Sequence, residues 1–330
     1  MPRRLVLLGS DEIALPAFAA ACALPDTEVV AVYTQPDRPA GRGQEIRPNP
    51  VAAWARAEGL PLLQPEKLGP EDAVRLAALG VDLGVVMAYG QLLKADFLAA
   101  TRLGFVNFHG SLLPALRGAT PVEGALALGL AETGISLQQV VLRLDAGPIH
   151  ASRSLRPLPG EARAALRARL GVLAGELAAR ALPAILAGAS TPVPQDESLV
   201  TYARRLHRSD APLDFRQPAA VLGQRVLALE GWPGSTFDHR GVTIKVGAAR
   251  GEDSAMSGEP GQILAADRAG VRVACGQGEL LLTQLQRPGG KMLSAGEFLA
   301  GFPLAVGEIL ASAEMPAFVA ATPFPRAPKA

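Results

Sequence analysis

Three polar side chains near the middle of the chain have types and spacing suited to acyl-group chemistry. Asn107 and His109 stand two residues apart in an apolar stretch, so on a β-strand they would share one face. Asp145 follows a second apolar stretch, and a carboxylate beside His109 would orient the imidazole and favour its protonated form. An amide and an imidazolium can both stabilise a tetrahedral oxyanion. The trio therefore predicts direct transfer of a group between two bound substrates.

Other chemistries fit the sequence less well. Ser111 is near the trio, but a loop hydroxyl more often bonds the neighbouring backbone than acts as a nucleophile. Only two cysteines occur, Cys22 and Cys275, and neither lies in a CxxC or CxxH pattern. We therefore expect no metal site, no obligatory disulfide and a reducing compartment.

The elements that would position the trio alternate between strands and helices. Expected strands cover residues 5–8, 29–33, 60–63, 83–88, 105–109 and 133–144. Expected helices cover residues 15–24, 51–58, 71–79, 120–128 and 161–182, and Pro183 should end or kink the last of these. This alternation predicts an α/β fold with a doubly wound, mostly parallel sheet, a Rossmann variant that binds ligands at the carboxyl ends of its strands. His109 lies at such an end, and Asp145 is expected in a loop at an edge of the same sheet.

The first turn of this sheet argues against a dinucleotide. It reads Gly9-Ser10-Asp11-Glu12, without the further glycines of GxGxxG and with two carboxylates where a pyrophosphate would sit. We therefore expect neither NAD nor FAD.

The pattern changes in the second half of the chain. Short strands with turn signals cover residues 242–246, 261–264, 271–274 and 279–285, which predicts a small antiparallel, OB-like β-barrel. We expect a catalytic domain at 1–189, a linker at 190–209, the barrel at 210–316 and a Pro-rich tail at 317–330.

Residues 35–50 form an unusually long connection between a strand and a helix. Arg38 and Arg42 lie in it, and Gly41 and Gly43 would let the backbone approach a phosphate closely. A solvated surface loop is the alternative, but we favour a nucleic-acid contact.

The composition limits the class of protein. With 330 residues, 49% hydrophobic and 19% charged, the chain has room for two globular domains. A net charge of +1 argues against nucleic-acid binding over the whole surface and leaves room for a local basic patch. There is neither a signal-peptide pattern nor an apolar run long enough for a membrane span. We expect a cytoplasmic monomer with no membrane partner.

Four motifs resemble the signature of the folate-dependent formyltransferases: Asn107-Phe-His109-Gly-Ser-Leu-Leu-Pro114, Arg117-Gly118-Ala-Thr-Pro121, Thr133-Gly134 and Asp145-Ala-Gly147. The resemblance covers residues 5–307. It implies transfer of a formyl group from 10-formyltetrahydrofolate to an amine, with Asn107, His109 and Asp145 as catalytic residues. It also implies a folate site lined by Ser111, Leu112, Leu113 and Pro114.

Residues 33–43, 85–90 and 195–203 resemble the members of this family that formylate methionine on the initiator tRNA. This implies methionyl initiator tRNA as partner, contacted through Arg38, Gly41, Arg42 and Gly43, with the barrel also binding tRNA. Two stretches depart from the family pattern, Gly9-Ser10-Asp11 and Val122-Glu123-Gly124.

Other functions stay open on the residues alone. The same trio would serve a formyltransferase acting on a sugar amine or a nucleotide, or a formyltetrahydrofolate hydrolase that uses water. The arginine-containing loop and the second domain favour the tRNA substrate. A nucleic-acid-binding module with a degenerate enzyme domain is a further class, and the intact trio argues against it.

Overall fold

The computed structural model describes residues 1–40, 43, 45–254 and 258–325. Contacts divide the chain into two compact units. The first unit comprises Met1–Gly118, Thr133–Leu155 and Arg167–Thr201, and the second comprises Ala119–Glu132, Arg156–Leu166 and Tyr202–Ala330.

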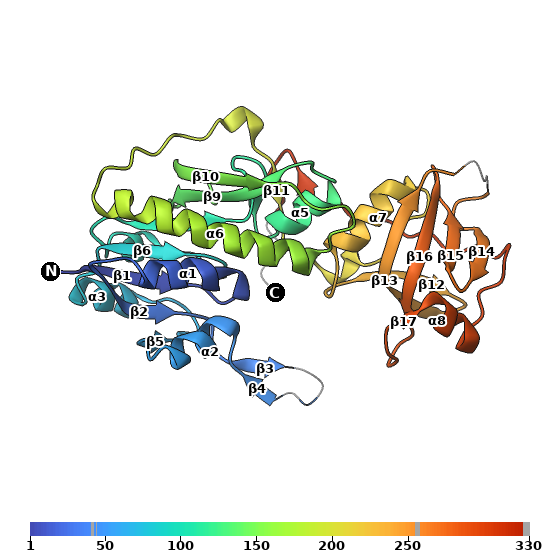
Figure 1. Cartoon of the computed structure of the whole chain (residues 1–330), viewed down its shortest axis with the longest axis horizontal. Coiled ribbons are helices and arrows are strands. Elements are labelled where there is room, and N and C mark those ends of the chain that lie inside the picture. Colours follow the sequence, from blue (N-terminus) through green and yellow to red (C-terminus); the bar gives the residue numbers. More distant parts are fainter. Residues whose placement is uncertain (41–42, 44, 255–257, 326–330) are drawn as a thin grey trace. The chain divides into compact units, whose positions relative to one another are not determined.

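A seven-stranded sheet forms the centre of the first unit, in the order β10-β9-β7-β6-β1-β2-β5 (Figure 1). Its strands are β1 (Arg3–Leu8), β2 (Thr27–Tyr33), β5 (Leu62–Leu63), β6 (Leu83–Val86), β7 (Phe105–His109), β9 (Thr133–Gln139) and β10 (Ile149–Leu155). All neighbours from β7 to β5 pair in parallel, whereas β9 runs antiparallel to both β7 and β10. The predicted doubly wound, mostly parallel sheet is confirmed.

Helices cover both faces of this sheet. They are the 3-10 helix η1 (Glu12–Ala14), α1 (Leu15–Cys22), α2 (Pro50–Ala57), α3 (Pro70–Ala78), α4 (Ala95–Leu98) and α6 (Arg163–Leu186), of which α6 begins in the second unit. Val6 and Leu8 pack in one buried cluster with Leu76 of α3 and Phe97 of α4. The opposite face carries α1 and α6 (Figure 1). Residues 5–8 of β1 form a continuous buried apolar run because both faces of a parallel sheet are covered.

The structure corrects two expected element limits and adds one hairpin. The strand expected at 133–144 ends at Gln139. The helix expected to stop or kink at Pro183 continues to Leu186, because a proline near the end of a helix removes only one of its last hydrogen bonds. Part of the long connection at 35–50 forms a hairpin of β3 (Arg38–Ala40) and β4 (Glu45–Arg47).

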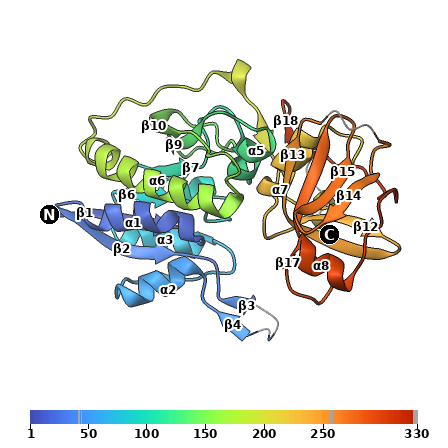
Figure 2. The same ribbon diagram turned by 45° about the vertical axis from the view of Figure 1, so that its right-hand side comes forward.

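An antiparallel sheet forms the centre of the second unit, in the order β12-β13-β16-β15-β14, with β17 beside β16 (Figure 2). The strands are β12 (Ser235–His239), β13 (Val242–Glu252), β14 (Ile263–Asp267), β15 (Gly270–Ala274), β16 (Glu279–Gln286) and β17 (Leu293–Ser294). Its core joins sheet residues to Leu222 and Val226 of α7 (Ala219–Ala228) and to Phe298 of α8 (Ala295–Gly301). The antiparallel strands predicted for the second half of the chain are therefore confirmed.

Shorter elements complete both units. They are β8 (Arg117–Gly118) and the 3-10 helix η2 (Glu197–Leu199) in the first, and α5 (Pro121–Ala127), β11 (Tyr202–Ala203), the 3-10 helix η3 (Arg208–Asp210) and β18 (Val319–Ala320) in the second. β18 pairs with β11, and the neighbouring Phe318 is buried. Within the ranges that the structure describes, no helix combines the length and the apolarity needed to cross a membrane.

Candidate active site

Strand β7 carries the predicted pair of polar side chains, and its register shows what faces them. Asn107 lies opposite Gln138 and His109 lies opposite Ser136 on the antiparallel strand β9. Residues directly opposite in such a pair present their side chains to the same face, as do residues two apart in one strand. Asn107, His109, Gln138 and Ser136 therefore share one face of the sheet.

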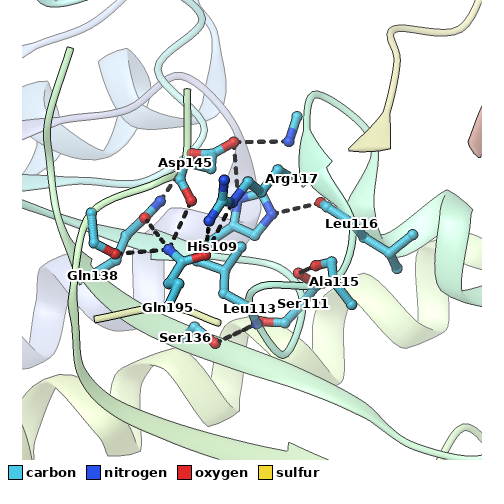
Figure 3. Close-up of polar contacts among 12 residues, drawn as sticks. His109, Ser111, Leu113, Ala115, Leu116, Arg117, Ser136, Gln138, Asp145 and Gln195 are labelled. Atoms are coloured by element: carbon cyan, nitrogen blue, oxygen red, sulfur yellow. Dashed lines mark hydrogen bonds and ion pairs between the residues drawn. The ribbon is translucent and has the colours of Figure 1, made fainter. Parts of the chain in front are cut away.

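Two contacts fix the orientation of the His109 ring, which is 5% exposed (Figure 3). The Nε2 atom lies 2.9 Å from the carbonyl oxygen of Leu116, and because a carbonyl can only accept, Nε2 is the donor. The Nδ1 atom faces Asp145, with 3.7 Å between Nδ1 and Oδ2. A doubly protonated His109 would thus direct one N–H toward Leu116 and the other toward a carboxylate.

Asp145 is held from two further sides. Its Oδ2 accepts a 2.8 Å hydrogen bond from the backbone N–H of Gly118, and its Oδ1 accepts one of 3.0 Å from Nε2 of Gln138. Its backbone has φ of 47°, in the left-handed region that L-residues adopt only where the surroundings require it.

The loop of Asp145 reaches this position from an unexpected direction. Gln139, the last residue of β9, pairs with Val106, and the N–H of Val140 donates to the carbonyl of Phe105. Strand β9 therefore ends beside the beginning of β7. Residues 140–146 fold back toward His109, which differs from the expected loop following a strand that ends at residue 144.

Asn107 has a free amide among the residues that the structure describes. Its side chain is half-buried, and no other side chain or backbone group of the described ranges hydrogen-bonds to it. The amide can therefore bind a ligand on the face that it shares with His109.

The loop after β7 is fixed by hydroxyl groups. Ser111 donates from Oγ to the carbonyl of Ala115 at 2.6 Å, which is the backbone bond expected for this hydroxyl. The backbone N–H of Leu113 donates to Oγ of Ser136, and that hydroxyl donates to the carbonyl of Ser111. Ser111 and Leu113 are buried, whereas Leu112 and Pro114 are half-buried. Contact of this loop with folate stays a prediction.

A second layer of side chains around Asp145, which the sequence did not predict, is formed by Gln138, Gln195 and Arg117 (Figure 3). The amide nitrogen of Gln195 donates to the carbonyl oxygens of Asp145 and Gly147 at 2.8 and 2.7 Å. Its Oε1 accepts from Nε and a terminal nitrogen of Arg117 at 3.0 and 2.7 Å. Side chains alternate between the two faces of a strand, and this alternation along β9 could have indicated that Gln138 shares a face with Asn107 and His109. No local signal in the sequence connects Gln195 with Asp145.

A buried cation anchors this layer. The Arg117 side chain is 0% exposed and also bonds Glu197 at 2.9 Å. The Arg117 guanidinium, with Arg143 beside it, holds the pKa of the Glu197 carboxyl below its usual value.

The candidate tRNA loop is described only in part. Arg38 pairs with Glu66 at 2.5 Å, and both side chains are mostly exposed. Gly43 is exposed, whereas Gly41 and Arg42 lie outside the described residues. Contact of these four residues with tRNA stays a prediction.

The two departures from the family pattern have local partners. Asp11 accepts from the N–H of Ile13 at the start of η1 and pairs with Arg167 at 2.8 Å. Glu123, buried in α5, lies 3.6 Å from Arg163. Each of these two carboxylates, which differ from the family pattern, thus has an arginine partner within its own unit.

Across the described ranges, no group of three or more His, Cys, Asp or Glu side chains is arranged to hold a metal ion.

The chain matches two family models that cover most of its length. Residues 3–182 match the model described as formyl transferase, and residues 205–303 match the model of the formyl transferase C-terminal domain. Similar solved folds include an N-formyltransferase from Helicobacter canadensis, at a TM-score of 0.66 and 12% identity over 87% of this chain and 100% of the other. HypX from Aquifex aeolicus has a TM-score of 0.60 at 18% identity over 94% of this chain and 51% of the other. These findings define the class as formyl transferase.

Curated relatives narrow the class. The methionyl-tRNA formyltransferase of Methylococcus capsulatus is 42% identical over 92% of this chain and 98% of the relative. The methionyl-tRNA formyltransferase of Myxococcus xanthus is 41% identical over 92% of this chain and 96% of the relative. The chain belongs to the methionyl-tRNA formyltransferase family.

Proposed function

We propose that this enzyme transfers the formyl group of 10-formyltetrahydrofolate to the α-amino group of methionyl initiator tRNA, using Asn107, His109 and Asp145. The family supports the reaction. The observation that carries the assignment of residues is the Asn107 amide, which no group of the described ranges hydrogen-bonds, on the same face as His109. The Nδ1 atom of His109 in turn faces the Asp145 carboxylate at 3.7 Å.

Each side chain has a distinct task. The Asn107 amide donates an N–H to the formyl oxygen as negative charge develops there. His109 contributes positive charge in a mostly buried place, where a charge acts more strongly than in water. Asp145 balances that charge and keeps the ring fixed between its carboxylate and the Leu116 carbonyl.

The reaction needs little covalent chemistry from the protein. The neutral amine attacks the formyl carbon and a C–N bond forms, giving a tetrahedral oxyanion. The bond from that carbon to N10 of the folate then breaks, the amine loses a proton and N10 gains one. Holding two substrates in line for this attack can supply several kcal/mol of the rate enhancement.

The two substrates require separate surfaces. The loop of Ser111, Leu112, Leu113 and Pro114 would line the folate site because it follows β7 directly. The hairpin with Arg38 and Gly43 would contact the tRNA, together with Gly41 and Arg42.

The second unit would contribute a further tRNA contact. It has an open concavity of about 190 Å³ lined by Thr236, Thr243, Lys245, Gln286, Arg287, Pro288 and Gly289. Basic and amide side chains in such a place suit a sugar-phosphate backbone. A monomeric state and a cytoplasmic location remain predictions.

The test is transfer of a radiolabelled formyl group from 10-formyltetrahydrofolate to purified acceptors. We expect label on methionyl initiator tRNA and much less on methionyl elongator tRNA. Label on an amino sugar nucleotide and not on tRNA would replace this function with that of a sugar formyltransferase. Release of free formate without acceptor dependence would identify a hydrolase.

A further inference from the structure

We propose that Gln195 is a positioning residue for the catalytic carboxylate, acting through the backbone of the Asp145 loop. This inference rests on the proposed function, since it assumes that Asp145 serves catalysis. Gln195 lies 50 residues downstream of Asp145, in the segment before η2.

Every polar group of the Gln195 side chain is committed within the first unit. The amide nitrogen donates to two carbonyl oxygens of one turn, those of Asp145 at 2.8 Å and Gly147 at 2.7 Å. The amide oxygen accepts from two nitrogens of Arg117. These bonds fix which end of the amide faces the turn, because only the nitrogen can donate to carbonyls.

The backbone of the Asp145 turn requires such support. Asp145 has φ of 47°, which costs free energy for a residue with a Cβ. A Cβ at Gly147 would lie 1.7 Å from the carbonyl oxygen of Gln139, so the turn passes very close to the end of β9. Two hydrogen bonds from one amide to alternate carbonyls hold the turn in the conformation that places the carboxylate 3.7 Å from His109.

Arg117 in turn holds Gln195. Its buried guanidinium bonds both Gln195 and Glu197, two residues apart in the same segment. Hydrogen bonds therefore run from Arg117 through Gln195 to the Asp145 turn. Through them, a segment distant in sequence sets the position of the Asp145 carboxylate beside His109. A displacement of about 1 Å at a reacting group can reduce the rate about 100-fold.

A purely structural role would be to satisfy the buried Arg117. Two substitutions separate the roles. Gln195→Met has a similar size and removes both the donors and the acceptor. Gln195→Glu keeps an acceptor for Arg117 but cannot donate to the two carbonyls.

If Gln195 positions Asp145, both variants lose kcat by about 10- to 100-fold while the KM values of folate and tRNA stay within about twofold. If Gln195 only satisfies Arg117, Gln195→Glu restores wild-type kcat, and the inference is wrong. Thermal unfolding measured beside the kinetics shows whether Gln195→Glu remains folded.

A double-mutant cycle with Asp145→Asn provides a second, independent test. A residue that acts through the carboxylate has little left to position once the charge is gone, so Gln195→Met should change kcat by about twofold or less in the Asp145→Asn background. Additive losses would overturn the inference.

Gln91→Met is the matched control. Like Gln195, Gln91 uses both ends of its amide: the oxygen accepts from the backbone N–H of Leu68, and the nitrogen donates to the carbonyl of Pro65. These partners lie outside the Asp145 turn. Its effect should be additive with Asp145→Asn. Formyl transfer by the wild-type chain is measured first, so that failure of the proposed function is distinguished from failure of this inference.

Discussion

Replacing Asp145 with Asn tests the electrostatic part of the site most directly. The substitution removes one charge and keeps the size of the side chain. An asparagine oxygen can still accept from the N–H of Gly118, which now bonds Oδ2 at 2.8 Å. We therefore expect the fold to survive and the interaction with His109 to be lost.

The size of the effect follows from the geometry. The Asp145 side chain is 14% exposed and lies 3.7 Å from Nδ1 of His109. Two unit charges about 4 Å apart interact by about 4 kcal/mol at an effective dielectric constant of about 20. Partial solvation reduces this, so we expect about 2.7 kcal/mol, which corresponds to a fall in kcat of about 100-fold.

The assay is single-turnover transfer of labelled formyl from 10-formyltetrahydrofolate to saturating methionyl initiator tRNA, together with thermal unfolding. We expect the KM values to stay close to wild type, because neither substrate binds through the lost charge. A kcat within threefold of wild type, in a folded variant, would refute the assignment of Asp145.

Three further predictions concern the oxyanion, the tRNA contact and a buried carboxylate. His109→Ala and Asn107→Ala should each lower kcat by about 100- to 1000-fold, since each removes stabilisation of the oxyanion; turnover near wild type in either variant would contradict the assignment. Arg42→Ala should weaken tRNA binding and make the plot of log affinity against log salt less steep by about one if the side chain contacts a phosphate. Arg102→Ala, which removes a surface pair with Asp82, is the control, and equal affinities for all three proteins would exclude Arg42. Burial raises the pKa of Asp210, but hydrogen bonds from Arg204 and from the His207 backbone outweigh it, so the pKa lies below its usual value. The stability from Asp210 is therefore full above the unfolded pKa of about 3.9 and is lost as pH falls through the lower folded pKa. In urea unfolding, Asp210→Asn should cost about 3 kcal/mol at pH 7 and less below about pH 4, and a cost independent of pH would contradict this.

Local patterns explain why much of the fold could be predicted. Strand β7 occupies the expected residues 105–109, because a short apolar run between turn signals has few alternatives. Helix α5 begins at Pro121, one residue after the predicted start at 120, since proline suits the first turn of a helix. The hairpin β3–β4 was missed because each strand has only three residues, too few to show an alternation.

Some features of the site could likewise be predicted from the sequence, and others could not. The sequence alone predicts that Asn107 and His109 share a face, because side chains alternate along a strand with a period of two. It also determined the family, through motifs whose residue types are legible without coordinates. The approach of Asp145 from a loop that folds back toward His109 could not be predicted, since it depends on β9 running antiparallel to β7. The positions of Gln195 and Arg117 behind that loop could not be predicted either, because hydrogen bonds between segments distant in the chain leave no periodic trace in the sequence.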